Sequence, residues 1–221
     1  MCGRFAVTLP QDAMAQLFEA RPANDLPDVP NFNVCPTNAV HVVHNRGEGR
    51  DLVSMRWGFI PHWYKSLTDG PLLINARSET IAEKPAFRAA CRERRCLIPA
   101  TGFYEWTKDD EGKRLPWYIY PADEQPLVFA GVWQDWERDG ERHRTCAIVT
   151  CKANPTMSQI HARMPVVLTP DQWALWLGEN GHGAARLMTA APDDFLEFYR
   201  VDPAVNSNRA KGPELITPIE V

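Results

Sequence analysis

The sequence has no long hydrophobic run and no cysteine pattern typical of a metal site. None of its 221 residues belongs to a stretch of about 18 apolar residues, which argues against a transmembrane helix. The N-terminus lacks a basic segment followed by an apolar one, so we expect no signal peptide and a cytoplasmic protein. The six cysteines form no Cys-x-x-Cys pair and show no zinc-finger spacing with histidine. We therefore expect free thiols, no metal and no cofactor.

Common nucleotide and hydrolase motifs are also missing: no P-loop, Gly-x-Gly-x-x-Gly, Gly-x-Ser-x-Gly or His-Glu-x-x-His occurs. Positive charge is not in excess, because 24 Lys and Arg stand against 28 Asp and Glu, a net charge of −4 that is unusual for a nucleic-acid binder. Segment 77–95 departs from this balance, with six basic residues against three acidic ones. It either faces phosphates or forms a solvated helix surface with i,i+4 ion pairs.

Short strands are expected to outnumber short helices. The pattern shows no regular βαβ alternation, which argues against a doubly wound sheet. We predict one α+β domain over residues 1–221, a mainly antiparallel sheet or open barrel with short peripheral helices. The expected elements are a hairpin of 39–44 and 52–57, strands at 96–99, 117–120, 127–133 and 145–150, and helices at 11–18, 84–94, 154–160, 170–177 and, for a turn or two, 193–199.

Cys2 directly follows the initiator Met1. Methionine aminopeptidase removes Met1 before a small residue, which would leave Cys2 with a free α-amine beside its thiol. An α-amine titrates near pH 8 and can form a Schiff base with an aldehyde. The thiol can then close onto the imine as a thiazolidine. The alternative is that Cys2 is only the second residue of an ordinary protein, because one cysteine is weak evidence of catalysis.

Three further positions carry side chains suited to chemistry. Asn75 and Arg77 point to one side if their backbone is extended, but Asn75 or Ser78 could equally cap a helix. Glu105 lies among aromatic residues, which would desolvate its carboxyl group, unless it is an exposed residue on a two-faced strand. His161 is either a proton shuttle or a surface histidine.

Seven motifs occur in an order that resembles the SRAP family (SOS response-associated peptidase). The resemblance extends from Cys2 to about Leu168, with a weaker match at 212–215. The motifs are Met-Cys-Gly-Arg-Phe at 1–5, Phe-Asn-Val-Cys-Pro-Thr at 32–37, Arg-Trp-Gly-Phe-Ile-Pro at 56–61, Ile-Asn-Ala-Arg-Ser-Glu-Thr at 74–80, Gly-Phe-Tyr-Glu-Trp at 102–106, Ile-Val-Thr at 148–150 and Ile-His-Ala-Arg-Met-Pro at 160–165.

The resemblance implies a protein that crosslinks itself to abasic sites in single-stranded DNA during the DNA damage response. Cys2 would form a thiazolidine with the ring-opened deoxyribose. Asn75 would position the amine or the sugar, Glu105 would assist ring opening and proton transfer, and His161 would act as acid–base on the sugar oxygen. The expected partners are single strands with abasic sites and single-strand/double-strand junctions. The expected protein is a monomer, associated with the nucleoid in a bacterium.

The resemblance also implies a set of DNA contacts. Arginine side chains would bind phosphates, and an aromatic side chain of the loop after Pro61 would stack on a base. The expected DNA-binding residues are Arg4, Asn33, Thr37, Trp63, Arg77, Arg88, Thr150 and Arg163. Two other functions stay open: a thiol peptidase, including an autoproteolytic one, that uses Cys2 with Glu105 and His161, and a non-covalent single-strand binder.

Overall fold

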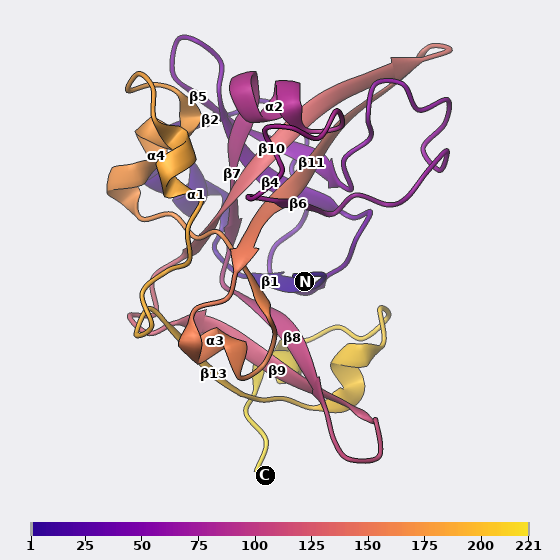
Figure 1. Ribbon diagram of the computed structural model, residues 1–221, viewed down its shortest axis with the longest axis vertical. Coiled ribbons are helices and arrows are strands. Elements are labelled where there is room, and N and C mark those ends of the chain that lie inside the picture. Colours follow the sequence, from indigo (N-terminus) through magenta and orange to yellow (C-terminus); the bar gives the residue numbers. More distant parts are fainter. Residues whose placement is uncertain (1, 221) are drawn as a thin grey trace.

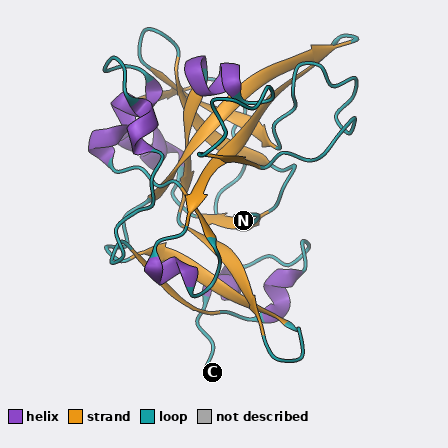
Figure 2. Cartoon of the chain, viewed as in Figure 1, coloured by secondary structure: helices purple, strands orange, loops and turns teal. Residues whose placement is uncertain are grey.

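The computed structural model describes residues 2–220 and contains two β-sheets that meet near the N-terminal strand, at the waist of the molecule (Figure 1). The helices are short and lie outside the strands (Figure 2). The strands are β1 (Phe5–Val7), β2 (Ala20–Pro22), β3 (Asn31–Val34), β4 (Ala39–Asn45), β5 (Arg50–Trp57), β6 (Asn75–Arg77), β7 (Arg95–Ala100), β8 (Gly102–Lys108), β9 (Arg114–Pro121), β10 (Leu127–Arg138), β11 (Glu141–Lys152), β12 (Arg163–Pro165) and β13 (Leu196–Arg200). The α-helices are α1 (Gln11–Leu17), α2 (Arg88–Glu93), α3 (Pro155–Ser158) and α4 (Pro170–Leu177), and 3₁₀ turns are η1 (Ala184–Leu187), η2 (Pro203–Asn206) and η3 (Pro213–Ile216).

The larger sheet closes into a barrel. Its order is β12-β11-β10-β7-β4-β5-β2, and β11 also pairs in parallel with β5, so that five strands form a ring. The smaller sheet has the order β13-β9-β8-β1-β3. Phe5 of β1 packs edge-on against Trp57 and Phe129 of the barrel, with ring centroids 5.1 and 5.8 Å apart. Strand β1 therefore belongs to the small sheet, while its Phe5 side chain packs into the core of the large sheet.

The expected fold class is confirmed, since strands dominate and most pairings are antiparallel. The 39–44 and 52–57 hairpin is present as β4 and β5, in antiparallel register. Helix α4 also forms as expected: Thr169 and Gln172 make a capping box, Pro170 occupies the first turn and Gly178 ends the helix with φ 80°. No helix within residues 2–220 is long and apolar enough to cross a membrane.

Two helix predictions differ from the structure. The expected helix at 84–94 begins only at Arg88, and turns precede it. The expected helical turns at 193–199 are wrong, because residues 196–200 form β13 and pair with β9. There, the Phe198 ring packs edge-on against Trp117 at 5.5 Å, and Leu196 is buried while Glu197 is exposed. Packing on β9 thus overrides a weak local helix signal.

Candidate active site

Cys2 is fully buried at the junction of the two sheets. Strand β6 runs parallel to β11, and this pairing brings Asn75 close enough for its Nδ2 to donate a 2.9 Å hydrogen bond to the Cys2 carbonyl oxygen. Asn75 is therefore in a strand, and the alternative of a helix cap is wrong. Its buried Oδ1 has no hydrogen-bond partner among residues 2–220. Since buried polar atoms are normally satisfied, this oxygen is suited to accept a hydrogen bond from a ligand or from an amine at Cys2.

Glu105 lies on β8, the neighbour of β1, and is only 4% exposed. The alternative of an exposed glutamate on a two-faced strand is therefore wrong. Burial is the main cause that raises the pKa of the Cys2 thiol, and the charge of Glu105 raises it further, whereas the Arg4 backbone N–H lowers it. The carboxylate and the thiol thus influence each other electrostatically, and the thiol is held in its protonated form.

His161 follows α3 and precedes β12. Its Nδ1 lies 3.0 Å from the backbone nitrogen and 3.1 Å from the carbonyl oxygen of Arg163, so it accepts from the N–H in one tautomer and donates to the carbonyl in the other. In both tautomers the Arg163 backbone holds Nδ1. Asn154 fixes the start of α3 by accepting from the Met157 N–H at 2.8 Å. Because hydrogen bonds hold both the start of α3 and the His161 ring, the imidazole has a defined orientation.

A cavity of ≈ 350 Å³ brings Glu105 and His161 together. This volume is within the range of small-ligand sites, about 300–1,000 Å³. Five lining residues were not predicted as site residues, although the motif at 102–106 already contains Trp106: Gly3, Trp106, Thr107, Lys108 and Arg114. The Arg114 guanidinium stacks 4.5 Å from the Trp106 ring, and Trp106 Nε1 donates to Asn206 Oδ1. The lining consists of Gly3, Arg4, Glu105, Trp106, Thr107, Lys108, Arg114 and His161.

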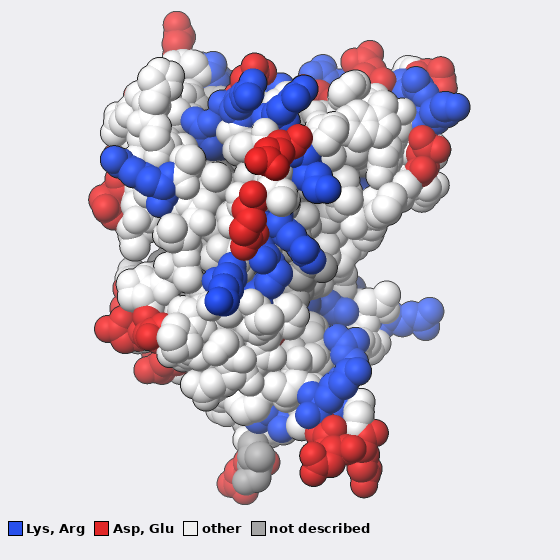
Figure 3. Space-filling model, in the orientation of Figure 1, with Lys and Arg blue, Asp and Glu red and all other residues white. Residues whose placement is uncertain are grey.

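Three basic side chains line this cavity: Arg4, Lys108 and Arg114. Figure 3 shows further basic side chains over α2, along the face below it and on the β8–β9 hairpin, with acidic ones between them and at the tip of the hairpin. A hollow lies between the upper part of the molecule and the hairpin. Arg77 and Arg88, two of the predicted DNA contacts, are exposed on β6 and at the start of α2. Arg95 is not part of this surface, because it donates to the carbonyl oxygens of Cys91 and Trp176.

Arg4 and Asn33 are held by the C-terminal segment 203–212. Arg4 Nη1 donates to Asn33 Oδ1 at 2.7 Å and to the Val205 carbonyl at 2.8 Å. Asn33 Nδ2 donates to the carbonyls of Ser207 and Ala210 at 3.0 and 2.7 Å. With 6% of its surface exposed, Asn33 uses its amide within the protein. Arg4 nevertheless lines the cavity.

Arg163 and Thr150 form a second internal cluster, at the β11–β12 pair. Arg163 Nη2 donates to the Thr150 carbonyl at 2.8 Å and to its Oγ1 at 3.2 Å. The outer nitrogens of Arg163 also bind both carboxylate oxygens of Glu79, at 3.0 and 2.9 Å. Thr150 is buried, so the structure assigns it the role of holding Arg163.

The two remaining predicted contacts lie on loops. Thr37 is exposed with φ 75°, in a turn fixed by its N–H, which donates to the Trp57 carbonyl at 2.7 Å. Trp63 is an exposed aromatic side chain whose ring meets His62 edge-on at 5.0 Å. Both are accessible to a ligand on the surface.

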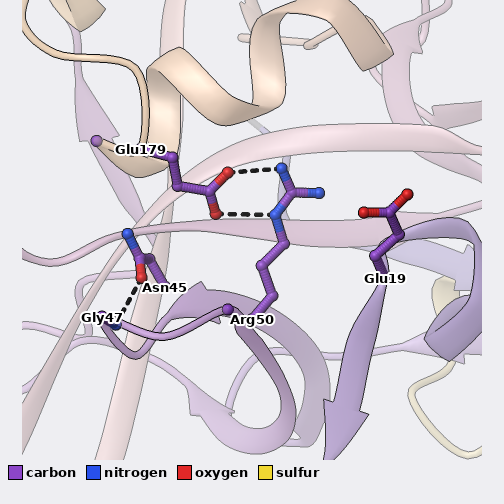
Figure 4. A pocket seen from close by; sticks show the side chains of 7 residues that line it. Glu19, Asn45, Gly47, Arg50 and Glu179 are labelled. Carbon is purple, nitrogen blue, oxygen red and sulfur yellow. Dashed lines mark hydrogen bonds and ion pairs between the residues drawn. The ribbon is translucent and has the colours of Figure 1, made fainter.

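A separate hollow lies between the β4–β5 turn and the end of α4 (Figure 4). Arg50 spans it with a bidentate ion pair to Glu179, at 2.8 and 2.7 Å, and also donates to the Phe18 carbonyl. Asn45 Oδ1 accepts from the Gly47 N–H. These polar groups bind one another. Their ion pair and hydrogen bonds stabilise the fold, and the hollow offers no reactive group.

Metal ligands do not gather at any point of residues 2–220: no group of three or more His, Cys, Asp or Glu side chains could hold an ion. All six cysteines are free, as the sequence predicts. Within the described part of the chain, the chemistry available at the cavity is therefore that of an amide, a carboxylate, an imidazole and a buried thiol.

The fold and the site define a protein whose N-terminal cysteine lies beside a cavity with basic walls. A family model described as SOS response associated peptidase (SRAP) matches residues 1–208. The chain belongs to the SRAP family.

Curated relatives match over nearly the whole chain. Abasic site processing protein YoqW of Bacillus subtilis (strain 168) is 36% identical over 223 residues, 98% of this chain and 99% of YoqW. Abasic site processing protein YedK of Escherichia coli (strain K12) is 32% identical over 99% of this chain and 100% of YedK. Abasic site processing protein HMCES of Rattus norvegicus is 29% identical over 100% of this chain and 77% of HMCES.

Solved structures share the fold. A crystal structure of a protein from Bacteroides thetaiotaomicron has a TM-score of 0.86 at 24% identity and covers 99% of this chain and 100% of that chain. One from Bordetella bronchiseptica has a TM-score of 0.78 at 26% identity, with 91% of this chain and 100% of that chain covered.

Proposed function

We propose that this protein processes abasic sites in single-stranded DNA by forming a covalent thiazolidine crosslink through Cys2. The proposal is supported by the names of its relatives, abasic site processing proteins. The observation that carries it is the arrangement around Cys2: an amide on its carbonyl oxygen, the Glu105 charge near its thiol, and a neighbouring cavity with basic walls. Met1, whose removal the proposal requires, lies outside the described residues.

The raised pKa of the Cys2 thiol favours crosslinking over the thiol peptidase alternative. A thiol nucleophile that attacks a peptide bond needs a lowered pKa, so that thiolate is present near neutral pH. Burial and the Glu105 charge act in the opposite direction here. In a thiazolidine mechanism the amine attacks first, and the thiol is needed only after the imine has formed.

The proposed steps balance without an added reagent. An abasic deoxyribose opens to expose a C1′ aldehyde. The Cys2 nitrogen bonds to C1′, and loss of one water gives an imine. The Cys2 sulfur then bonds to the same carbon, the imine electron pair moves to nitrogen, and nitrogen gains the proton that sulfur loses. The product is a five-membered ring that joins the protein to the DNA.

Each neighbouring side chain has a role in these steps. Asn75 binds the Cys2 carbonyl with its Nδ2 and offers its unsatisfied Oδ1 to the amine. Glu105 takes and returns protons at the amine, the imine and the thiol. His161 presents its Nε2 to the sugar oxygen, because Nδ1 is held by the Arg163 backbone. A positioned acid–base group contributes about 10²–10⁴-fold to rate.

We propose single-stranded DNA, including strands next to a duplex junction, as the partner. Exposed Arg77 and Arg88, together with Lys108 and Arg114 at the cavity, would contact phosphates. Trp63 would stack on a neighbouring base. With a net charge of −4, binding to intact DNA is expected to be weak and salt-dependent, and the covalent bond supplies durability.

We also propose that residues 1–221 act as one domain and as a monomer, in the cytoplasm and at the nucleoid of a bacterium. Support for one domain comes from one large cluster of buried residues that includes side chains of both sheets, among them Phe5, Phe103 and Leu196 of the small sheet with Trp57 and Val149 of the large one.

The test is mass spectrometry of the Met1-free protein after incubation with a single strand that carries one abasic site. Wild type is expected to form an adduct without reductant. Cys2→Ser is the matched control, because it keeps the amine but cannot form a thiazolidine, so its adduct should appear only with borohydride. Glu105→Gln and His161→Gln are expected to slow the reaction about 10²-fold or more. If Met1-free wild type gives no adduct, the crosslinking proposal is wrong, and affinity alone would leave a non-covalent binder.

A further inference from the structure

Glu79 binds Arg163, the cation that the family resemblance assigns to a DNA phosphate. Its two carboxylate oxygens accept from Nη1 and Nη2 of Arg163, at 3.0 and 2.9 Å. In this end-on, bidentate arrangement an arginine can also bind two oxygens of a phosphate. A phosphate and the Glu79 carboxylate therefore cannot occupy the outer edge of Arg163 together.

The pair is asymmetric in burial and in anchoring. Arg163 is 16% exposed in its side chain and Glu79 is 49% exposed. Thr150 holds Arg163 independently of Glu79, with Oγ1 3.4 Å from Nε and the carbonyl oxygen 2.8 Å from Nη2. Arg163 thus keeps its place when Glu79 moves away, and Glu79 can rotate into water at little cost.

The surroundings of the pair are basic. Arg77 precedes Glu79 by two residues and is exposed, and Arg88 lies on α2 of the same segment. Figure 3 shows acidic side chains that interrupt the basic ones on the face below α2. Hydrogen bonding to Arg163 lowers the pKa of Glu79, so its carboxylate is ionised at neutral pH.

We propose that Glu79 is a displaceable competitor for phosphate, which lowers the affinity of this protein for DNA that it cannot crosslink. This inference rests on the proposed function, because it takes single-stranded DNA as the ligand. A strand must displace the carboxylate to gain the Arg163 contact. On an intact strand this contact is weakened, whereas on an abasic strand the covalent bond makes a weak contact sufficient. Glu79 thereby favours lesions over intact DNA.

Removal of the carboxylate charge should tighten binding to intact DNA. An exposed ion pair is worth up to about 1 kcal/mol, so the expected gain in affinity is about two- to fivefold. One more phosphate contact on a single strand should also steepen the plot of log K against log salt by about 0.7. If Glu79 instead served to orient Arg163, its removal would weaken binding.

The experiment measures fluorescence anisotropy of an intact, labelled single strand at several salt concentrations. The variants are wild type, Glu79→Gln, Glu83→Gln, Arg163→Gln and the double variant Glu79→Gln/Arg163→Gln. Glu83→Gln is the matched control, because it removes the same charge from an exposed residue four positions away. The expected result is tighter binding and a steeper salt slope for Glu79→Gln, a smaller gain for Glu83→Gln, and, once Arg163 is replaced, no larger gain from Glu79→Gln than from Glu83→Gln.

Three results would overturn the proposal: unchanged or weaker binding by Glu79→Gln, an equal gain with Glu83→Gln, or a Glu79→Gln gain without Arg163 that still exceeds the Glu83→Gln gain. Absence of any binding to the intact strand by wild type and Glu79→Gln would overturn it as well. The proposed function is judged separately, by the adduct with an abasic strand. If the protein binds the intact strand but forms no adduct, the crosslinking function is contradicted. The effect of Glu79→Gln on binding can still be interpreted in that case.

Discussion

Replacement of Asn33 by alanine tests whether this residue holds the C-terminal segment or contacts DNA. Its amide makes three hydrogen bonds, to the carbonyls of Ser207 and Ala210 and from the Arg4 guanidinium. A hydrogen bond contributes about 0.5–1.5 kcal/mol to stability, and one that involves a charged group somewhat more. The expected loss in the free energy of unfolding is therefore about 3 kcal/mol.

The assay is urea unfolding followed by far-UV circular dichroism. With an m-value of roughly 2–3 kcal/mol per molar urea, the midpoint should fall by about 1 M. Asn208→Ala is the matched control, because Asn208 is exposed in the same segment. Adduct formation should slow too, because a loosened Arg4 stands two residues from Cys2. Unchanged stability together with weaker DNA binding would refute this reasoning and show that Asn33 is mainly a DNA contact.

Three further predictions concern pH, stability and DNA affinity. Burial lowers the pKa of His41 to about 4 from its usual 6.5, so the unfolded chain binds a proton that the folded chain excludes. The free energy of unfolding should fall by about 3 kcal/mol between pH 6.5 and pH 4, at 1.36 kcal/mol per pKa unit. Urea titrations should show this loss shrink in His41→Gln and persist in the control His182→Gln. Glu179→Gln breaks the bidentate pair with Arg50 and should lower stability by about 1–2 kcal/mol, measured by thermal unfolding; a shift no larger than that of an exposed-residue variant would contradict the role assigned to this pair. Arg114→Gln should reduce the salt slope of single-strand binding by about 0.7 if the cavity wall contacts a phosphate, and an unchanged slope would place the strand elsewhere.

The candidate catalytic residues can be picked out in the sequence, but the contacts between them cannot. Cys2 and Glu105 stand out locally, one by its position after Met1 and the other by its aromatic neighbours. The hydrogen bond from Asn75 to Cys2 joins residues 73 positions apart, and no local pattern reveals it. Two conformations of the Asn75 segment were open on the sequence, and only the pairing of β6 with β11 decided between them.

The predicted DNA contacts also depend on residues far apart in the sequence, which no local pattern reveals. The family resemblance implied that Arg4, Asn33 and Arg163 contact DNA, yet each is bound within the protein. Their partners lie far along the chain; Asn33 and Ser207, for example, are 174 positions apart. Strand β13 was misread for a related reason, since its conformation depends on β9 rather than on its own composition.

The burial of Cys2 sets an order of events during synthesis. Its enclosure depends on Asn75 and on β8, whose Phe103 pairs with Phe5. At roughly 5–20 residues per second, a ribosome needs on the order of 5–20 s to reach the end of β8 after the N-terminus is made. During this interval the bond between Met1 and Cys2 is open to an aminopeptidase. Excision of the initiator therefore competes with folding, and a chain that folds first would keep its amine blocked and its cysteine enclosed.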